Sequence, residues 1–432
     1  MVPPVDHPLR AALTNEVHAR PFAALRTPAR ISHVAMLSGE GGAAADRAHL
    51  DALLDRCGRK RPAAHANHVF EDCGGFRLKW ERHTEFCSWT VFVDGTAASP
   101  FATPAIETVP ADWLAELPGS RLVAIHAAVE RVEGPSAVDD LARHFEPEFM
   151  AGSAVSGGGA EVWTDFRIHA DGFGRVLVRD RALKPRQAGR LVQRLLEIET
   201  YRMMALLALP VAREVGPTIS AADRELVAIT AAMHNLGGLG DERRLLSKLT
   251  GLAAEVERVT AQSSYRFGAA RAYAALVERR IGELREERIE GVQTIAEFMD
   301  RRLAPALRTC AATAERLEAI AARLQRAGDL LRSRVDIALE AQNQALLASM
   351  DRRAQLQLRL QATVEGLSVA AISYYVVGLI GYAAKALEKG GVAVHPEIAT
   401  GVAIPFVVLA VWTLVRRARR HIGERAPSSR ER

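Results

Sequence analysis

The pattern of apolar and polar residues divides the chain into three regions with different periodicities. Up to about residue 184, short runs of β-branched and aromatic residues are bounded by Gly, Pro or Asp, which is typical of strands. From Pro185 onward, apolar residues recur every three or four positions, which predicts long helices. Two runs near the C-terminus carry no charge. The pattern predicts an α+β domain, a helical region and two strongly apolar segments.

Within the first region we expect six strands, at residues 30–37, 76–81, 86–93, 122–129, 161–168 and 175–179. The Asp-Gly-Phe-Gly sequence at 171–174 predicts a turn that joins the last two strands in a hairpin. Residues 43–57 have a helical pattern. The small residues at 153–159 predict a loop.

The helical region is interrupted by glycine and proline. A first helix is predicted from Pro185 to Pro210, a break at Gly216 and Pro217, and a new N-cap at Ser220. Two long helices should follow, one at about residues 241–303 and one from near residue 305 into the first apolar run. The second has a heptad seam that later thins to alanines, which predicts a coiled-coil arm or stalk; the seam residues are Leu317, Ile320, Leu324, Ala327 and Leu331.

The two charge-free runs are residues 367–384 and 398–415, and each helix of 18 residues would be about 27 Å long. That length crosses the hydrocarbon core of a bilayer, and the alternative is a pair of buried core helices in a soluble protein. Arginines precede the first run at Arg352, Arg353 and Arg359, and more follow the second. By the positive-inside rule, both termini should be cytoplasmic. We therefore expect a multi-pass protein of the bacterial inner membrane, with the lipid bilayer as a partner.

The predicted division of the chain has six parts. They are a cytosolic α/β domain (1–184), a long helical or coiled-coil region (185–366), a first transmembrane helix (367–384), a short external loop (385–397), a second transmembrane helix (398–415) and a basic cytosolic tail (416–432).

Composition excludes some classes of protein. Hydrophobic residues make up 49% and charged residues 25%, which is a globular rather than a disordered balance. The net charge of +5 comes from the arginine-rich tail, and its place after an apolar run favours a membrane anchor over a nucleic-acid partner. The four cysteines form no C-x-x-C pair, and charges and prolines fill the first 30 residues. We therefore expect no signal peptide and reduced thiols.

Two polar stretches are the candidates for a binding site. Glu16, His18 and Arg20 form a dense polar string near the N-terminus. Glu16 and His18 are two residues apart, a spacing that does not fit the metal-binding helix of zinc peptidases. The alternative role for these side chains is structural hydrogen bonding. The second stretch has ionisable side chains that alternate along a predicted strand and the turn after it, which suits an ion-paired sheet face or a binding surface. Its candidates are Lys79, Glu81, Arg82, His83 and Glu85.

Other motifs argue against an enzyme. His65, His68, Cys73 and Cys87 fit no common zinc-finger spacing, so buried cysteines are the favoured interpretation. The glycines at 157–159 lack the Gly-Lys-Ser/Thr ending of a phosphate loop, and neither G-x-G-x-x-G nor G-x-S-x-G occurs. We therefore expect no catalytic residue, metal or cofactor.

The first apolar run contains polar and small residues that suit a pore or close helix packing: Tyr374, Tyr375, Gly378, Gly381 and Tyr382. The alternative is ordinary placement of aromatic side chains toward lipid or at the membrane interface.

Three segments carry a resemblance to a known family: HPLRAALTNEVHARP, GGFRLKWERHTEF and QLRLQATVEGLSVAAISYYVVGLIGY. They resemble the bacterial membrane-anchored proteins called domain of unknown function 3422. The segments are spread over almost the whole chain. The resemblance implies membrane anchoring and no particular activity.

The order of parts is similar to that of CorA-type magnesium transporters, which implies a homo-oligomer built around a stalk helix. The first span of those transporters ends in Gly-Met-Asn, whereas this one continues from Gly381 and Tyr382 to Lys385. A lysine there repels divalent cations. The expected function is therefore either a homo-oligomeric CorA-like ion channel or transporter, or a non-conducting membrane-anchored scaffold or regulator that binds a soluble protein partner.

Overall fold

In the computed structural model, the described residues are 6–10, 13–14, 22–39, 42–95, 97–133, 138–391 and 395–423. They form two compact units. The first contains residues 1–235 and 245–328, and the second contains residues 236–244 and 329–432.

Over the described residues, nine strands of the first unit form one mixed sheet in the order β2-β3-β4-β1-β5-β8-β7-β6-β9. Neighbouring strands are antiparallel except β5 and β8, which are parallel. The strands are β1 (Ala29–Leu37), β2 (His68–Asp72), β3 (Arg77–Arg82), β4 (Cys87–Asp94), β5 (Ser120–Arg131), β6 (Ala151–Val155), β7 (Ala160–Thr164), β8 (Gly174–Asp180) and β9 (Glu287–Arg288).

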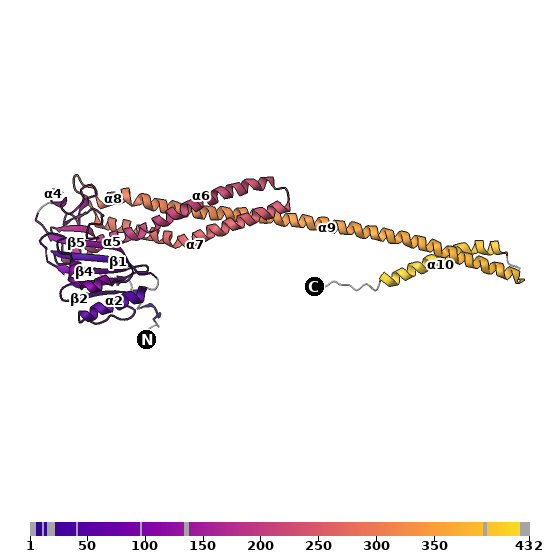
Figure 1. The fold of residues 1–432 in the computed structure, drawn as a ribbon, viewed down its shortest axis with the longest axis horizontal. Helices are drawn as coiled ribbons and strands as arrows, with labels where there is room; N and C mark the ends of the chain where they lie inside the picture. The colour runs from indigo at the N-terminus through magenta and orange to yellow at the C-terminus, as the bar shows by residue number, and fades with distance from the viewer. Residues whose placement is uncertain are drawn as a thin grey trace, which may run out of the picture. The chain divides into compact units, whose positions relative to one another are not determined.

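The described helices are α2 (Gly42–Arg56), α3 (Ala111–Ala115), α4 (Val138–Leu141), α5 (Pro185–Leu206), α6 (Ala208–Ala232), α7 (Leu239–Leu284), α8 (Ile295–Arg302), α9 (Ala304–Lys389) and α10 (Pro396–Gly423). Two 3-10 turns, η1 (Ala105–Thr108) and η2 (Met233–Asn235), lie between them. Figure 1 shows α9 as one unbroken helix, so the predicted run from residue 305 into the first apolar segment is confirmed. The broad prediction of an α+β sheet domain and a long C-terminal helix is also confirmed.

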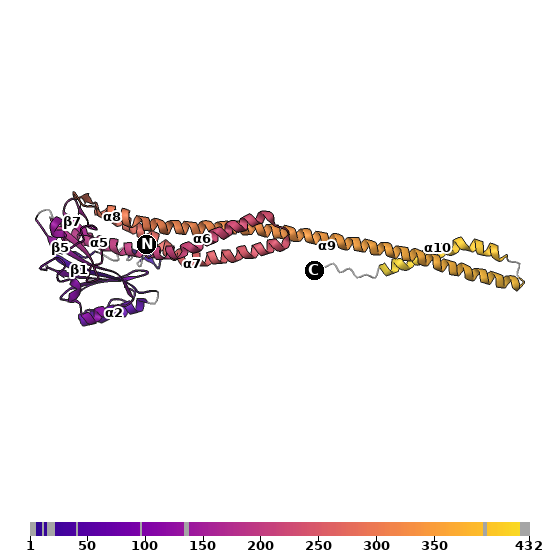
Figure 2. The same ribbon diagram turned by 45° about the horizontal axis from the view of Figure 1, so that its top comes forward.

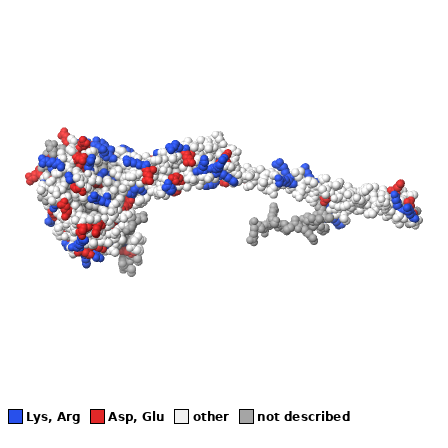
Figure 3. Space-filling model, viewed as in Figure 1, with Lys and Arg blue, Asp and Glu red and all other residues white. Residues whose placement is uncertain are grey.

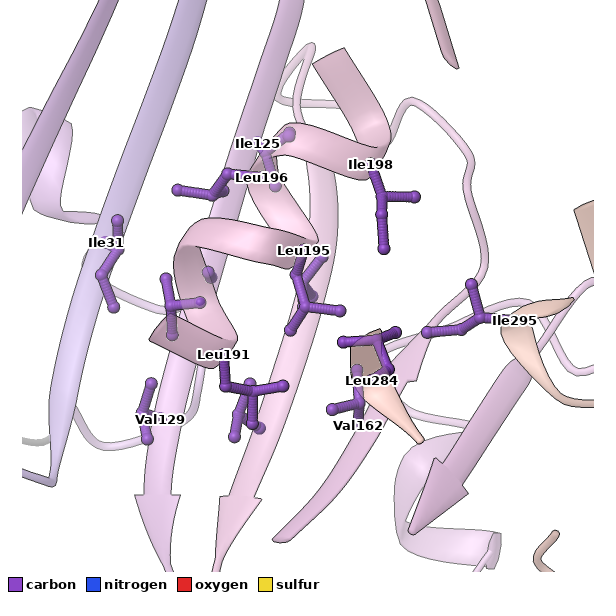
Figure 4. Close-up of a cluster of buried hydrophobic side chains, with 14 of the residues drawn as sticks. Ile31, Ile125, Val129, Val162, Leu191, Leu195, Leu196, Ile198, Leu284 and Ile295 are labelled. Atoms are coloured by element: carbon purple, nitrogen blue, oxygen red, sulfur yellow. The ribbon is translucent and has the colours of Figure 1, made fainter. Parts of the chain in front are cut away.

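The sheet is buried on both faces. Over β1, β5 and β8, the inner face packs on α5, and Figure 4 shows Leu191, Leu195 and Leu196 pointing toward the strands. Over β1, β3 and β4, the opposite face packs on α2 and α3 through residues such as Trp80 and Trp89. Figure 2 shows α2 and α5 on opposite sides of the sheet. Because both faces are covered, nearly every residue of β1 and β4 is buried, including polar residues such as Ser32 and Thr90.

A second core in this unit holds three helices together. Ile219 and Leu226 of α6, Leu249 and Val256 of α7, and α9 residues up to Ala327 form one buried cluster. The heptad seam at Leu317, Ile320 and Leu324 is therefore filled by α6 and α7 of the same chain. The three helices pack as a bundle up to Ala327, and a coiled-coil stalk beyond this residue stays a prediction.

Several local predictions were wrong. The loop at 153–159 begins inside β6, whose edge is paired with β7 and β9. The strand predicted to reach residue 168 ends at Thr164, because Phe166 has a left-handed φ of 54°. The helix predicted at 241–303 ends at Leu284, where Arg285 has a φ of 50° and β9 follows.

The break predicted at Gly216 and Pro217 was also wrong, since α6 passes through both residues. Ile219 and Leu226 are buried against α7 and α9, and this packing outweighs the poor helix propensity of proline. Ser220 is not an N-cap, and its hydroxyl donates to the Gly216 carbonyl at 3.0 Å. The predicted domain boundary after residue 184 marks the start of α5, but α5 packs into the core of the sheet.

In the second unit, the end of α9 and α10 lie side by side as a helical hairpin. A side chain at Gly381 would meet Thr400 Oγ1 at 3.3 Å, while Ala384 and Val407 are buried. Among the residues described, α9 and the Pro396–Arg417 part of α10 are long and apolar enough to cross a membrane. Figure 3 shows this hairpin as mostly uncharged, with charged side chains gathered at its tip, where the sequence has Lys385, Glu388 and Lys389.

Candidate binding site

A cavity of about 770 Å³ lies in the first unit between the sheet and two helices. Strands β1, β3 and β4 supply one wall, and α5 and α7 supply the other. Its volume is in the range of pockets that enclose small molecules.

Strand alternation explains why this wall is polar. On β3, Lys79 and Glu81 line the cavity, while Leu78 and Trp80 point into the opposite core. On β4, Ser88 and Thr90 line the cavity in the same way. The register places Lys79 beside Thr90 and Thr90 beside His33 of β1, so one polar row crosses three strands.

Lys79 and Glu81 form a buried ion pair on this wall. Lys79 Nζ lies 2.9 Å from Glu81 Oε1, and their side chains are 6% and 13% exposed. Lys79 Nζ also donates to Gln193 Oε1 of α5 at 3.3 Å. Burying two charges costs free energy that their attraction offsets only in good geometry. A pair of this kind is therefore a stronger sign of a binding site than of stability.

His33 is fully buried next to this pair, and its hydrogen bonds define its protonation. The Thr200 hydroxyl donates to the Leu196 carbonyl at 2.8 Å, so it accepts from His33 Nε2 at 3.1 Å. His33 Nδ1 then accepts from the Thr90 hydroxyl at 2.8 Å. Burial, together with the charges of Lys79 and His83, lowers the pKa of His33 to about 3. The ring is neutral, and it ties β1 to β4 and α5.

The helical wall carries its own chain of charges. Gln193 donates to Glu197 at 2.7 Å, and Glu197 is paired with Arg280 of α7. Arg280 also lies 3.0 Å from Glu283, which is paired with Arg194. Burial opposes the charged form of Arg280, but Glu197 and Glu283 outweigh it and raise its pKa. Arg280 is thus a fixed cation on the side of the cavity that faces the sheet.

Aromatic rings and a further ion pair complete the walls. Tyr201 and Tyr273 stack with ring centroids 5.7 Å apart, and His83 stacks on Phe86 at 4.2 Å. Glu85 is paired with Arg266 of α7. Burial, followed by the hydrogen bond and charge of Glu85, raises the pKa of Tyr273 well above its ordinary value, so its hydroxyl stays protonated. These rings offer flat apolar surface beside the charges.

The structure gathers one of the two predicted stretches at the cavity. Lys79, Glu81, Arg82 and His83 all line it, while Glu85 lies at its edge against α7. Glu16, His18 and Arg20 lie outside the described residues. The binding role of these residues stays a prediction.

The residues predicted to line a pore or pack helices differ in placement. Tyr374, Tyr375 and Tyr382 are between 71% and 78% exposed. Gly381 faces Thr400 of α10, whereas the position of a side chain at Gly378 is open. Among these five described residues, Gly381 lies close to α10, and Tyr374 lines a groove together with Ile404 and Val408 of α10.

The cysteines and histidines weighed for zinc lie apart. Cys73 interacts with Cys57, while Cys87 is buried near Asp46 and Ser38. Burial raises the pKa of both Cys73 and Cys87 to about 12. Over the described part of the chain, no group of three or more His, Cys, Asp or Glu side chains is placed to hold a metal ion.

Sequence reasoning missed the helical half of the site. Gln193, Glu197 and Tyr201 recur every four residues along α5, and this polar stripe inside an apolar helix was the available signal. Tyr273 and Arg280 belong to α7 and follow the α5 residues by more than 70 positions in the chain. No local pattern in the sequence connects them with β3.

Comparison with known proteins bears on the family alone. No curated protein and no solved structure matches the chain. A family model described as protein of unknown function (DUF3422) matches residues 5–422. Since this match covers nearly all of the 432 residues, the chain belongs to the DUF3422 family.

Proposed function

We propose that the protein is a membrane-anchored binding protein that holds a small anionic molecule in the cavity of its first unit. The observation that supports this most is the buried Lys79–Glu81 pair on the cavity wall. Well-packed apolar side chains at both positions would make the protein equally stable or more stable, so stability does not explain the presence of this ion pair. The proposal is a form of the membrane-anchored regulator, with a small molecule in place of a protein partner.

The charges of the lining favour an anionic ligand. Lys79, Arg82 and Arg280 contribute three cations, whereas Glu81 and Glu197 contribute two carboxylates. His33 adds no charge, since burial keeps its ring neutral. The tyrosine and phenylalanine rings suit a ligand with a flat or apolar part beside its anionic group.

Membrane anchoring rests on α9 and α10. Both carry long apolar segments whose large side chains, such as Leu379, Phe406 and Leu414, are exposed. Lipid would cover these side chains. Arginines before the first segment and after the second put both ends on the cytoplasmic side, with the short loop outside, in a bacterial inner membrane.

Ligand binding is tested with a double variant and a matched control. Lys79→Met with Glu81→Leu replaces the buried pair by apolar side chains, and Arg61→Met with Asp55→Asn removes an exposed pair instead. Full-length protein in detergent is screened by thermal shift against carboxylates and phosphate esters, and native mass spectrometry detects co-purified molecules. We expect the cavity variant to bind roughly tenfold to a hundredfold more weakly, and the control to bind as the parent does.

The result that overturns the proposal is a parent protein that carries no small molecule and is stabilised by none of the probes. Equal binding by the cavity variant and the parent would also overturn it, because the ligand would then lie elsewhere.

Ion conduction is a second candidate, and the unbroken α9 is the observation that favours it. One helix of 86 residues contains both the bundle segment and the first apolar segment, as in the layout of CorA-type transporters. Against it stands Lys385 at the end of that segment. Flux of Mg²⁺, K⁺ or Na⁺ into proteoliposomes would support conduction, and the absence of flux for all three would eliminate it.

A further inference from the structure

An apolar stripe along the middle of α9 faces solvent in the second unit. Leu346 and Leu360 are 61% and 66% exposed, and both lie before the apolar segment that begins at Leu367. Met350, Leu356 and Val364 are exposed as well. Contiguous large apolar side chains are rarely left in water by a single chain, and such a surface marks a site of interaction.

The spacing of the stripe is that of a coiled coil. Leu339, Leu346, Leu360 and Leu367 differ by multiples of seven, with Arg353 at the third of the five positions of this series. The companion positions, four residues after each, are Asn343, Met350, Gln357 and Val364, so the leucines occupy d positions and these residues occupy a positions. This register holds over residues 339–367, about 44 Å of helix and four heptads, which is the length at which coiled coils become stable.

We propose that this stripe pairs with the same stripe of a second copy of the chain, in a parallel, in-register, two-stranded coiled coil. Two identical copies present leucines at the same spacing, so each d-position leucine meets its own counterpart. The parallel direction rests on the proposed membrane anchoring, since two copies held by the same C-terminal hairpin have α9 running the same way at the same depth.

Arg353 decides for two strands. A polar residue at an a position, here Asn343, sets register and oligomeric state at a cost in stability. Arg353 lies at a d position, and the seam of a two-stranded coil is open at its edges, so the long stem packs while the guanidinium reaches water. In a larger closed bundle, several copies of Arg353 would be enclosed together without a carboxylate on the same face.

Cysteine cross-linking in membranes tests the pairing and its direction. Leu346→Cys and Leu360→Cys place thiols on the seam, while Gln344→Cys and Ala362→Cys place them at nearly matched heights on the outer face. With a mild oxidant, the seam variants should give at least about ten times more disulfide-linked dimer than the outer variants, because only facing Cα atoms come within bridging distance. The parent chain, with its own four cysteines, sets the background.

Light scattering of the full chain in detergent gives an independent measurement. The parent should have twice the 46.9 kDa of one chain. Leu346→Glu with Leu360→Glu should halve that mass, and Gln344→Glu with Ala362→Glu should leave it unchanged.

Equal cross-linking of seam and outer variants, or none, would overturn the pairing, as would a monomeric parent. A parent mass above two chains would overturn the two-stranded assignment. Adducts of the seam cysteines with a different protein would assign the stripe to another partner. Sodium carbonate extraction of the same membranes distinguishes the membrane anchoring from the pairing of the stripe. If the chain is extracted by carbonate but the Leu346→Cys variant still forms the cross-linked dimer, the anchoring is refuted and the pairing is not.

Discussion

At the scale of single residues, the cavity owes its character to polar side chains that are buried with partners. Lys79 has Glu81 and Gln193, and His33 has Thr90 and Thr200. Each partner satisfies a group that would otherwise be costly to bury. These residues are therefore sensitive to the loss of one partner and tolerant of the loss of both.

The ion pair gives the first prediction. Lys79→Met alone leaves Glu81, whose side chain is 13% exposed, without its cation and should lower the free energy of unfolding by about 3–5 kcal/mol. The double variant, with Glu81→Leu added, should recover most of that loss. Tryptophan fluorescence in urea measures it, because Trp80, Trp89, Trp113 and Trp163 all lie in the first unit. Arg61→Met at the surface is the control and should change stability by less than about 1 kcal/mol.

The buried histidine gives a prediction about pH. His33 has a pKa of about 3 when folded and an ordinary value near 6.5 when unfolded, so below that value the unfolded chain binds a proton that the folded one does not. Its contribution to stability is constant at higher pH and falls as the pH drops from about 6.5 toward 3. Between about pH 7 and pH 5 the loss is about 2 kcal/mol.

His33→Gln keeps a donor and an acceptor but cannot titrate, so it should flatten this part of the pH dependence. His126, whose pKa burial lowers to about 4, contributes in the same direction and remains in the variant. His65→Gln, at an exposed rim position, is the control. An unchanged slope in His33→Gln would show that His33 is not the responsible group.

At the scale of elements, α5 is the part that joins the core to the cavity. It packs its leucines on β1, β5 and β8, and it presents Gln193, Glu197 and Thr200 to the cavity. The segment before β1 packs against the first turns of α5, since the Leu25 amide donates to the Pro185 carbonyl at 3.0 Å. Gly189 permits this approach, because a Cβ there would lie 1.7 Å from the Ala23 carbonyl oxygen.

Substituting this glycine tests the contact. Gly189→Ala gains helix propensity but forces the segment at Ala23 to move, so we expect a net destabilisation of about 1–3 kcal/mol. Gly251→Ala in α7 has open space at its Cβ and should stabilise its helix by up to about 1 kcal/mol. Opposite signs in thermal unfolding are the expected outcome, and a stabilised Gly189→Ala would refute the close approach.

At the scale of the whole molecule, one chain contains a polar cavity and two helices that suit a bilayer. The first unit buries its apolar side chains in its own cores. The second leaves Leu379, Phe406 and Leu409 exposed. The contrast is what the proposed membrane anchoring requires, with water around the first unit and lipid around the apolar helices of the second.

Inserting charged residues into the two apolar segments tests whether lipid surrounds them. Leu379→Asp with Leu409→Asp places a carboxylate in each apolar segment, at a cost of about 2.5–3.5 kcal/mol per residue near a bilayer centre. A large fraction of this variant should leave the membrane in sodium carbonate, while the parent stays. Gln344→Asp with Gln361→Asp, outside both segments, should behave as the parent. Full retention of the Leu379/Leu409 variant would argue against two membrane spans.

Part of the site was predictable because it is local. Lys79, Glu81 and His83 were singled out from alternation along one strand and the turn that follows it, and that alternation holds in β3. Gln193, Tyr273 and Arg280 were not, since a cavity depends on which helix covers which strand. The fold was predictable to a similar extent: β1, β4, β5 and β8 follow runs with β-branched residues, and β3 follows an alternating pattern around Trp80. The short β6 and β9 are strands only through their pairing.

The sequence by itself determined the features that depend on near neighbours and on composition: the strands with strong runs, the long helix α9, the two apolar segments and membership of the DUF3422 family. Tertiary structure decided the rest. Packing kept α6 helical through Pro217, turned the seam of α9 toward α6 and α7, and placed Arg280 opposite Lys79 around one cavity. The reason is physical: periodicity fixes which face of an element is apolar, while the partner of that face lies far away in the chain and is chosen by shape and burial.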